Sequence, residues 1–181
     1  MTAREHVHDL PDEVEATLVS TGRRTDAERL IERLGELGWT LAVAESLTGG
    51  LVVAELVAVS GASAVVRGGV VAYATELKQR LLHVDGALLD AHGAVHPRVA
   101  RQMAEGARVA LGPGAAAADV GIATTGIAGP GSPDGQPVGT VHIAVATALG
   151  VRIESLQLEG DRAQIRAEAS ARAIRLALDA L

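Results

Sequence analysis

Amphipathic helical segments alternate with short apolar runs along this chain, and that alternation restricts its fold more than any other feature. Apolar residues recurring at helical spacing predict helices over residues 25–37, 49–58, 75–82, 97–111 and 161–181. Apolar runs of strand length predict strands over residues 40–44, 67–73, 119–124, 139–148 and 151–158, the last two joined as a hairpin at Gly150. This order indicates an α/β fold, a three-layer α/β/α sandwich on a mixed β-sheet.

Capping signals support several of these helices. Thr25 and Glu28 fit a capping box, and Pro97 follows His96 at a first helical position, where its missing N–H costs nothing. Thr75 and Asp161 are the expected N-caps of two further helices.

The length of 181 residues is enough for one well-buried domain, which we expect over residues 25–181. Residues 1–24 carry Pro11 and many charges, and they are expected to form an N-terminal extension with room for one short helix. Hydrophobic residues make up 48% of the chain but aromatic residues only 1%, so the core must consist of Ala, Val, Leu and Ile.

Composition excludes several classes of function. No apolar run approaches the roughly 18 residues of a membrane span, and the polar, acidic N-terminus does not resemble a signal peptide, so a cytoplasmic protein without membrane contact is expected. The chain has no cysteine, which leaves Ser, Thr or water as a nucleophile. A net charge of -6 and a pI near 5.5 argue against nucleic-acid binding. The expected partner is a small molecule.

Polar or glycine-rich segments follow three of the predicted strands, over residues 45–50, 73–78 and 124–131. Ligands of open α/β sheets gather at the carboxyl ends of strands. In the stretch LAVAESLTGGLVVAELV, Ser46 and Thr48 could simply cap the next helix. Gly49 and Gly50 favour a functional reading, because glycines let backbone N–H groups approach an anion, as a phosphate cradle or an oxyanion hole.

Lys78 is the one lysine among 16 basic residues, and Tyr73 is the one tyrosine. Arginine cannot release its proton in a protein, whereas lysine can serve as a base when desolvation lowers its pKa. A solvated helix lysine and a half-buried aromatic are the ordinary alternatives. Their position beside a serine-bearing strand end favours Ser46 as nucleophile, Lys78 as its base and the Tyr73 hydroxyl as a proton relay.

The histidines and Arg162 are further candidates for a binding site. Histidines cluster as His83, His92 and His96, and as His6 and His8, but neither group has the spacing of a recognisable metal site, so no metal is expected. Arg162 follows Asp161 at the start of the last helix, where it is either a solvated charge or a clamp on a phosphate or carboxylate.

The chain contains five ordered motifs: AESLTGG, RGGVVAYATELKQRLLHV, HGAVHP, TTGIAGPGSPDGQPVGTV and GDRAQIR. Together they resemble the CinA C-terminal domain family, whose members also occur alone as nicotinamide-nucleotide amidohydrolases of the PncC type. The resemblance covers roughly residues 25–181. The nucleotide-pyrophosphatase domain of full-length CinA has no counterpart in this sequence, so that activity is not expected.

The resemblance implies hydrolysis of nicotinamide mononucleotide to nicotinate mononucleotide and ammonia, in pyridine-nucleotide salvage and without a cofactor. It implies that Ser46 is the nucleophile, Lys78 the base and Tyr73 the relay. The residues implied in substrate binding are Glu45, Thr48, Gly49, Gly50, Thr125, Gly126, Gly129 and, near the phosphate, Arg162. A homo-oligomer, with a dimer as the simplest case, is expected.

Leu47 and Gln136 depart from residues that are frequent in the family, Cys and Lys respectively. Two alternatives remain open at this point. One is a non-catalytic nucleotide-binding or regulatory module linked to competence or DNA damage. The other is an amidase for a different small amide. Separately, if Lys78 is not the base, Glu45 is the alternative residue that could activate water.

Overall fold

A computed structural model gives the structure of residues 24–132 and 135–181. Apart from Arg24, the expected N-terminal extension lies outside these described residues, as do His6 and His8. The helices are α1 (Asp26–Leu37), α2 (Leu51–Val57), α3 (Thr75–Leu82), α4 (Gly86–His92), α5 (Pro97–Ala110) and α6 (Arg162–Asp179), with a 3-10 turn η1 over Ala62–Ala64. The strands are β1 (Leu41–Glu45), β2 (Val66–Val71), β3 (Val120–Gly126), β4 (Thr140–Thr147) and β5 (Gly150–Gln157).

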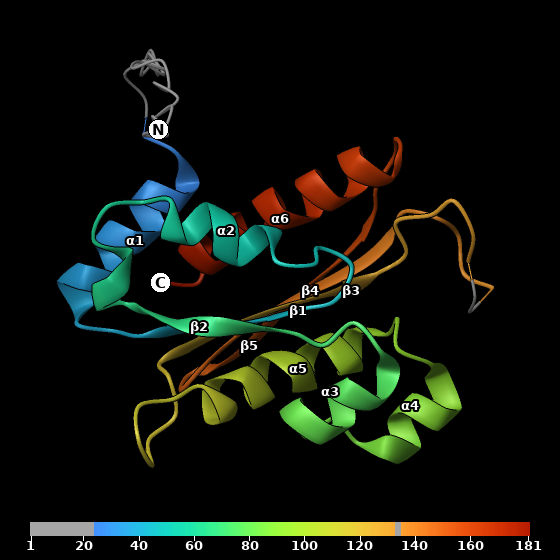
Figure 1. Cartoon of the computed structure of the whole chain (residues 1–181), viewed down its shortest axis with the longest axis horizontal. Coiled ribbons are helices and arrows are strands. Elements are labelled where there is room, and N and C mark those ends of the chain that lie inside the picture. The colour runs from blue at the N-terminus through green and yellow to red at the C-terminus, as the bar shows by residue number, and fades with distance from the viewer. Residues whose placement is uncertain (1–23, 133–134) are drawn as a thin grey trace, which may run out of the picture.

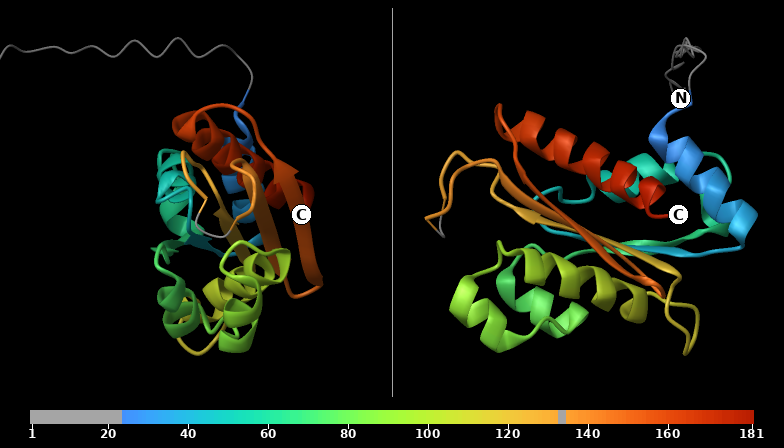
Figure 2. Two further views of the ribbon diagram at one scale, coloured as in Figure 1. Left: turned by 90° about the vertical axis from the view of Figure 1, so that its right-hand side faces the viewer. Right: turned by 180° about the vertical axis from the view of Figure 1, so that it is seen from behind.

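The five strands form one mixed sheet in the order β2-β1-β3-β4-β5. Strand β1 pairs in parallel with β2 and β3, whereas β4 pairs antiparallel with β3 and β5. Helices α1, α2 and α6 cover one face of the sheet, and α3, α4 and α5 cover the other (Figure 1). The views from the side and from behind in Figure 2 show the same three layers. The predicted three-layer α/β/α sandwich on a mixed sheet, in a single domain, is therefore confirmed.

The two faces of the sheet carry side chains of different size. Along β1, Leu41 and Val43 face the layer of α1, α2 and α6, whereas Ala42 and Ala44 face the layer of α3, α4 and α5. Small residues on the second face let α5 approach closely: a Cβ added at Gly121 would lie 2.1 Å from the backbone oxygen of Ala104. The hydrophobic core consists of Ala, Val, Leu and Ile together with Met103, and the partly buried Trp39 packs against it.

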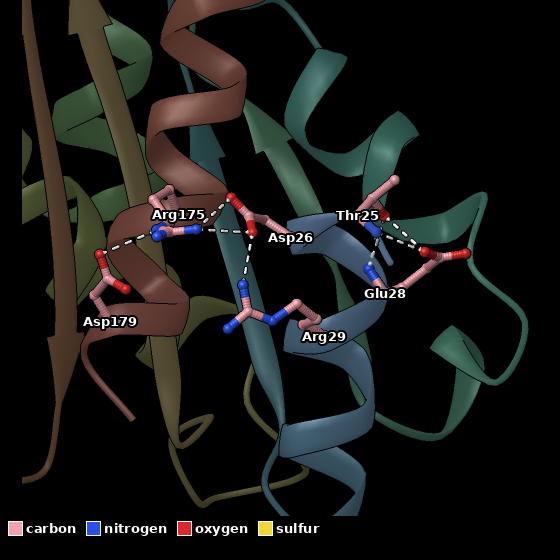
Figure 3. Close-up of polar contacts among 6 residues, drawn as sticks. All are labelled: Thr25, Asp26, Glu28, Arg29, Arg175 and Asp179. Carbon is pink, nitrogen blue, oxygen red and sulfur yellow. Dashed lines mark hydrogen bonds and ion pairs between the residues drawn. The ribbon is translucent and has the colours of Figure 1, made fainter. Parts of the chain in front are cut away.

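Local capping confirms the predicted start of α1. The side chain of Thr25 accepts from the Glu28 N–H, and the Glu28 carboxylate accepts from the Thr25 N–H (Figure 3). Beside this cap, Arg175 of α6 donates to both carboxylate oxygens of Asp26 at 3.0 and 3.1 Å, which ties α6 to α1. Asp161 caps α6 through a second capping box, also as predicted.

Two local predictions were wrong. Thr75 is the first residue of α3 and not its N-cap, which is Ala74, a residue without a capping side chain. Helix α4 was not predicted, because its seven residues, GALLDAH, are too few to show a helical period. No helix within the described residues has the length and apolar character that crossing a lipid bilayer requires.

Candidate active site

The site begins where β1 ends. Side chains alternate between the faces of a strand, so Glu45 points toward α2 and Ser46 points to the opposite face with Ala42 and Ala44. The Ser46 N–H donates to the Thr124 carbonyl at 3.1 Å, which extends the pairing of β1 with β3 by one residue. The sheet therefore holds the Ser46 backbone in place, and its hydroxyl faces the layer that contains α3.

Lys78 of α3 meets that hydroxyl. Its side chain is 1% exposed, and Nζ lies 3.1 Å from Ser46 Oγ, 2.8 Å from the Ala72 carbonyl oxygen and 3.3 Å from the Tyr73 carbonyl oxygen. A neutral amine has two hydrogens and one lone pair. As an ammonium, Nζ donates to all three oxygens; as a neutral amine, it can donate to the two carbonyls and turn its lone pair toward Ser46, which is the arrangement that a base for the hydroxyl requires.

A cavity of about 310 Å³ opens onto this pair. Its wall combines the ends of β1 and β3, the β2–α3 junction, residues 94–95 and the start of α6. The lining residues are Ser46, Leu47, Tyr73, Thr75, Lys78, Ala94, Val95, Thr125, Gly126, Ile127, Ala128, Gly129, Gly131 and Arg162. Their side chains include two basic groups and, among the residues that the structure describes, no carboxylate. Such a cavity suits a small molecule that carries an anionic group.

Arg162 and Tyr73 lie together at the cavity. Arg162 Nη1 donates to the Gly129 carbonyl at 2.7 Å, and Arg162 Nη2 donates to the Tyr73 hydroxyl at 3.1 Å. Tyr73 remains 59% exposed. The hydroxyl of Tyr73 is thus bonded to the guanidinium, while Lys78 contacts Ser46 directly. The contact between Lys78 and Ser46 needs no relay.

Two side chains fix the wall formed by Ala94 and Val95. The Thr125 hydroxyl donates to the Ala94 carbonyl at 2.7 Å, and Gln136 Nε2 donates to the Val95 carbonyl at 2.8 Å. Thr125 therefore connects the end of β3 to the segment before α5. Gln136 supplies a second link from the glycine- and proline-rich loop after β3, in which the Gly129–Pro130 peptide is cis.

Comparison with known proteins identifies the family of this chain. The protein-family model described as "CinA C-terminal domain" matches residues 23–181. The chain belongs to the CinA C-terminal domain family. A CinA-like protein from Frankia casuarinae is 51% identical over 137 residues, which are 76% of this chain and 30% of that protein. A CinA-like protein from Anaeromyxobacter dehalogenans is 50% identical over 149 residues, 81% of this chain and 35% of that protein. The chain thus spans about a third of the length of these CinA relatives.

Solved CinA structures share the fold over most of their length. A CinA superfamily protein from Escherichia coli superposes with a TM-score of 0.80 at 32% identity, covering 86% of this chain and 88% of that one. A competence/damage inducible protein from Agrobacterium tumefaciens gives a TM-score of 0.76 at 35% identity, covering 86% and 97%. The predicted family resemblance is confirmed.

Several residues implied in substrate binding lie outside the cavity of this CinA domain. The buried Glu45 carboxylate accepts from the N–H groups of Gly50 at 2.8 Å, Val52 at 3.3 Å and Val53 at 3.0 Å. It therefore satisfies the amides at the start of α2, and the Gly50 amide is not available to bind an anion there. The reason is the alternation along β1, which turns Glu45 away from Ser46.

The Thr48 hydroxyl and the Gly49 amide also have structural partners. The Thr48 hydroxyl lies 2.8 Å from the Thr124 hydroxyl in a buried contact between the β1–α2 loop and β3. The Gly49 N–H donates to the Ser46 carbonyl at 3.2 Å. By contrast, the other residues named as site candidates line one cavity: Thr125, Gly126, Gly129 and Arg162, together with Ser46, Tyr73 and Lys78.

His92 and His96 flank the wall residues Ala94 and Val95 in sequence, and His142 pairs with the lining residue Thr125 across β3 and β4. The rings of His92 and His96 stack with their centroids 4.7 Å apart, and His142 Nδ1 lies 2.8 Å from Ser155 Oγ. Burial lowers the pKa of His96, with further lowering from His92 and Arg98. Burial also lowers the pKa of His142, and His96 adds to the effect. In the described part of the chain, no three His, Asp or Glu side chains are placed to hold a metal ion.

Sequence reasoning missed Arg166, one turn beyond Arg162 on α6. Its Nε donates to the Leu47 carbonyl at 3.0 Å, and its Nη2 donates to the Thr48 carbonyl at 2.8 Å. A signal was present, since helical spacing places residues 162 and 166 on one face of a helix. The packing of α6 against the loop before α2 was not readable from sequence.

Proposed function

We propose that this CinA domain is an amidohydrolase that deamidates nicotinamide mononucleotide to nicotinate mononucleotide and ammonia. The observation that carries the proposal is the 3.1 Å contact between Lys78 Nζ and Ser46 Oγ at the wall of a cavity. A buried lysine is costly unless its amine is neutral or well partnered, because burial disfavours a charged amine. Serine with a lysine base is an established arrangement for acyl transfer.

The chemistry proceeds in two halves. Ser46 Oγ attacks the carboxamide carbon while its proton passes to Lys78 Nζ, giving a tetrahedral oxyanion. When this species collapses, Lys78 returns the proton to the departing nitrogen, and ammonia leaves an ester on Ser46. Water then attacks the ester with Lys78 as base, which releases the acid product and regenerates the free serine hydroxyl.

Charge supports a nucleotide as substrate. Arg162 lines the cavity, and its two contacts to Gly129 and Tyr73 hold the guanidinium in a defined orientation. A guanidinium so placed is suited to a phosphate group. In this proposal Tyr73 orients Arg162, and Thr125 and Gly126 line the amide and ribose side. The Glu45 carboxylate, the Thr48 hydroxyl and the Gly50 amide support the loop that carries Ser46.

The test is ammonia release from nicotinamide mononucleotide by the purified protein, measured beside Ser46→Ala. The wild type is expected to release ammonia and the variant to release none, with the variant still binding the nucleotide. Binding without release by the wild type would favour a nucleotide-binding module instead. Turnover of other small amides, with this nucleotide inert, would keep the mechanism and change the substrate.

A further inference from the structure

In the loop between β1 and α2, some backbone N–H groups have a hydrogen-bond acceptor within the protein and others have none. The Ser46 N–H is used by the sheet, and the Gly49 N–H closes a turn on the Ser46 carbonyl at 3.2 Å. The amides at the start of α2 are held by the Glu45 carboxylate. Within residues 24–132 and 135–181, the amides of Leu47 and Thr48 donate to no protein acceptor.

The carbonyls of the same peptides are held in place. The Ser46 carbonyl, which shares a peptide with the Leu47 N–H, accepts from Gly49. The Leu47 carbonyl, which shares a peptide with the Thr48 N–H, accepts from Arg166 Nε at 3.0 Å. The C=O and N–H of a trans peptide point in opposite directions. Holding the two carbonyls therefore fixes the direction of the two available N–H groups.

We propose that Arg166 is a positioning residue that orients the Leu47–Thr48 peptide, so that the amides of Leu47 and Thr48 stabilise the oxyanion formed at Ser46. This inference rests on the proposed acyl transfer at Ser46. The two residues directly follow the nucleophile, and Leu47 itself lines the cavity. Donors fixed before the reaction are the main requirement of an oxyanion hole, since they need no reorganisation in the transition state.

The guanidinium fits this task because it donates to two successive carbonyls. Nε reaches Leu47 and Nη2 reaches Thr48 at 2.8 Å, a forked contact that the single amine of a lysine does not reproduce. Gly49 leaves room for the guanidinium: a Cβ there would lie 3.3 Å from Arg166 Nη2, and the φ of Gly49 is +61°. The loop thus offers Arg166 both two carbonyl acceptors and the space for its guanidinium.

The inference is tested with a fluorophosphonate probe, which does not depend on the natural substrate. Ser46 Oγ attacks phosphorus, the P–F bond breaks, fluoride leaves, and the serine proton passes to Lys78, while the phosphoryl oxygen needs the same donors as the oxyanion. The labelling rate at Ser46 is measured by mass spectrometry in wild type, Arg166→Ala, Arg166→Lys and Arg175→Ala. Arg175 is the matched control, because it lies on α6 but pairs with Asp26.

Losing one oxyanion donor costs about 10² to 10³-fold in rate, so Arg166→Ala is expected to label more slowly by this factor. Arg166→Lys, which keeps the charge and is the safer variant for folding, is expected to lose at least about 10-fold. Added guanidinium should restore part of the Arg166→Ala rate, which a general loss of structure would not allow. Arg175→Ala should label like the wild type.

The outcomes separate this inference from the function it rests on. Wild-type labelling that disappears in Ser46→Ala supports the nucleophile. If Arg166→Ala and Arg166→Lys then label at the wild-type rate, the positioning role is overturned and the nucleophile stands. If Ser46 of the wild type is not labelled at all, the nucleophile fails and the oxyanion assignment fails with it.

Discussion

Replacing Lys78 by arginine separates a base from a fixed cation. The variant keeps the positive charge and most of the length, but arginine cannot give up its proton. In the wild type, Lys78 is 1% exposed, and its Nζ lies 3.1 Å from Ser46 Oγ and 2.8 Å from the Ala72 carbonyl. A guanidinium can satisfy the carbonyl, yet it has no lone pair for the serine proton.

General base catalysis contributes about 10² to 10⁴-fold, which corresponds to roughly 2.7 to 5.5 kcal/mol of transition-state stabilisation. We expect Lys78→Arg to lower kcat for ammonia release by a factor in this range, with a much smaller change in KM. The assay is steady-state ammonia release, together with a thermal melt that checks folding. Lys78→Met controls for the extra bulk of arginine, since it removes the amine without adding length.

Two results would refute the assignment. Near wild-type kcat in Lys78→Arg would show that a fixed cation is enough, and Lys78 would no longer be the base. Retained activity in Lys78→Met would show that any loss in the arginine variant is steric. Recovery of Lys78→Ala by a small added amine would support the base role independently.

The other predictions concern substrate binding, the loop that carries Ser46, and pH. Arg162→Ala should raise KM for the mononucleotide by roughly 10- to 150-fold, since a charge-assisted contact contributes about 1.5 to 3 kcal/mol; equal changes for the mononucleotide and the phosphate-free riboside would remove Arg162 from the phosphate site. Glu45→Ala should destabilise the fold by roughly 3 kcal/mol, because three buried or half-buried N–H groups lose their acceptor; a denaturant titration at constant pH checks this, and an unchanged midpoint would contradict the capping role. Because burial lowers the pKa of His96 and His142 in the folded chain, the unfolded chain binds their protons first as pH falls from about 6.5. The contribution of these histidines to stability should therefore be fully present above that pH and decline below it. Thermal melts from pH 7.5 to 5.5 measure the decline, which should be smaller in His96→Asn, because asparagine keeps an N-cap acceptor but does not titrate. An identical decline in the variant would contradict the role of His96.

The convergence of Ser46, Tyr73, Lys78 and Thr125 could be predicted from sequence because it follows from topology. Parallel strands place their carboxyl ends at one edge, so residues after β1, β2 and β3 meet there. The single lysine then stood out among arginines. The fold class followed in the same way from the order of helical and apolar segments.

The placement of Glu45 required the strand to be read one residue at a time. Glu45 and Ser46 are neighbours in sequence, but alternation along β1 sends their side chains to opposite faces of the sheet. The motif suggested a shared role at the ligand, whereas Glu45 holds the start of α2. Adjacent motif residues at a strand end therefore divide between contact with the cavity and support of the backbone.

The contacts of Arg166 depend on how α6 docks, and local sequence carries no signal of that. Arg166 lies 119 residues from Leu47, and its two carbonyl acceptors are visible only once α6 packs beside the β1–α2 loop. Local propensity likewise failed for α4, a short helix that is stabilised by burying Leu88 and Leu89 against α3 and α5 neighbours in the alanine-rich core.

The central claim, an ester of Ser46 formed from the carboxamide, is tested most directly by trapping with hydroxylamine during turnover of nicotinamide mononucleotide. Hydroxylamine should compete with water for the ester and give the hydroxamate of the product, in an amount that rises with the hydroxylamine concentration. Ser46→Ala should form neither hydroxamate nor ammonia. Ammonia release by the wild type without any hydroxamate, together with retained ammonia release by Ser46→Ala, would contradict the claim.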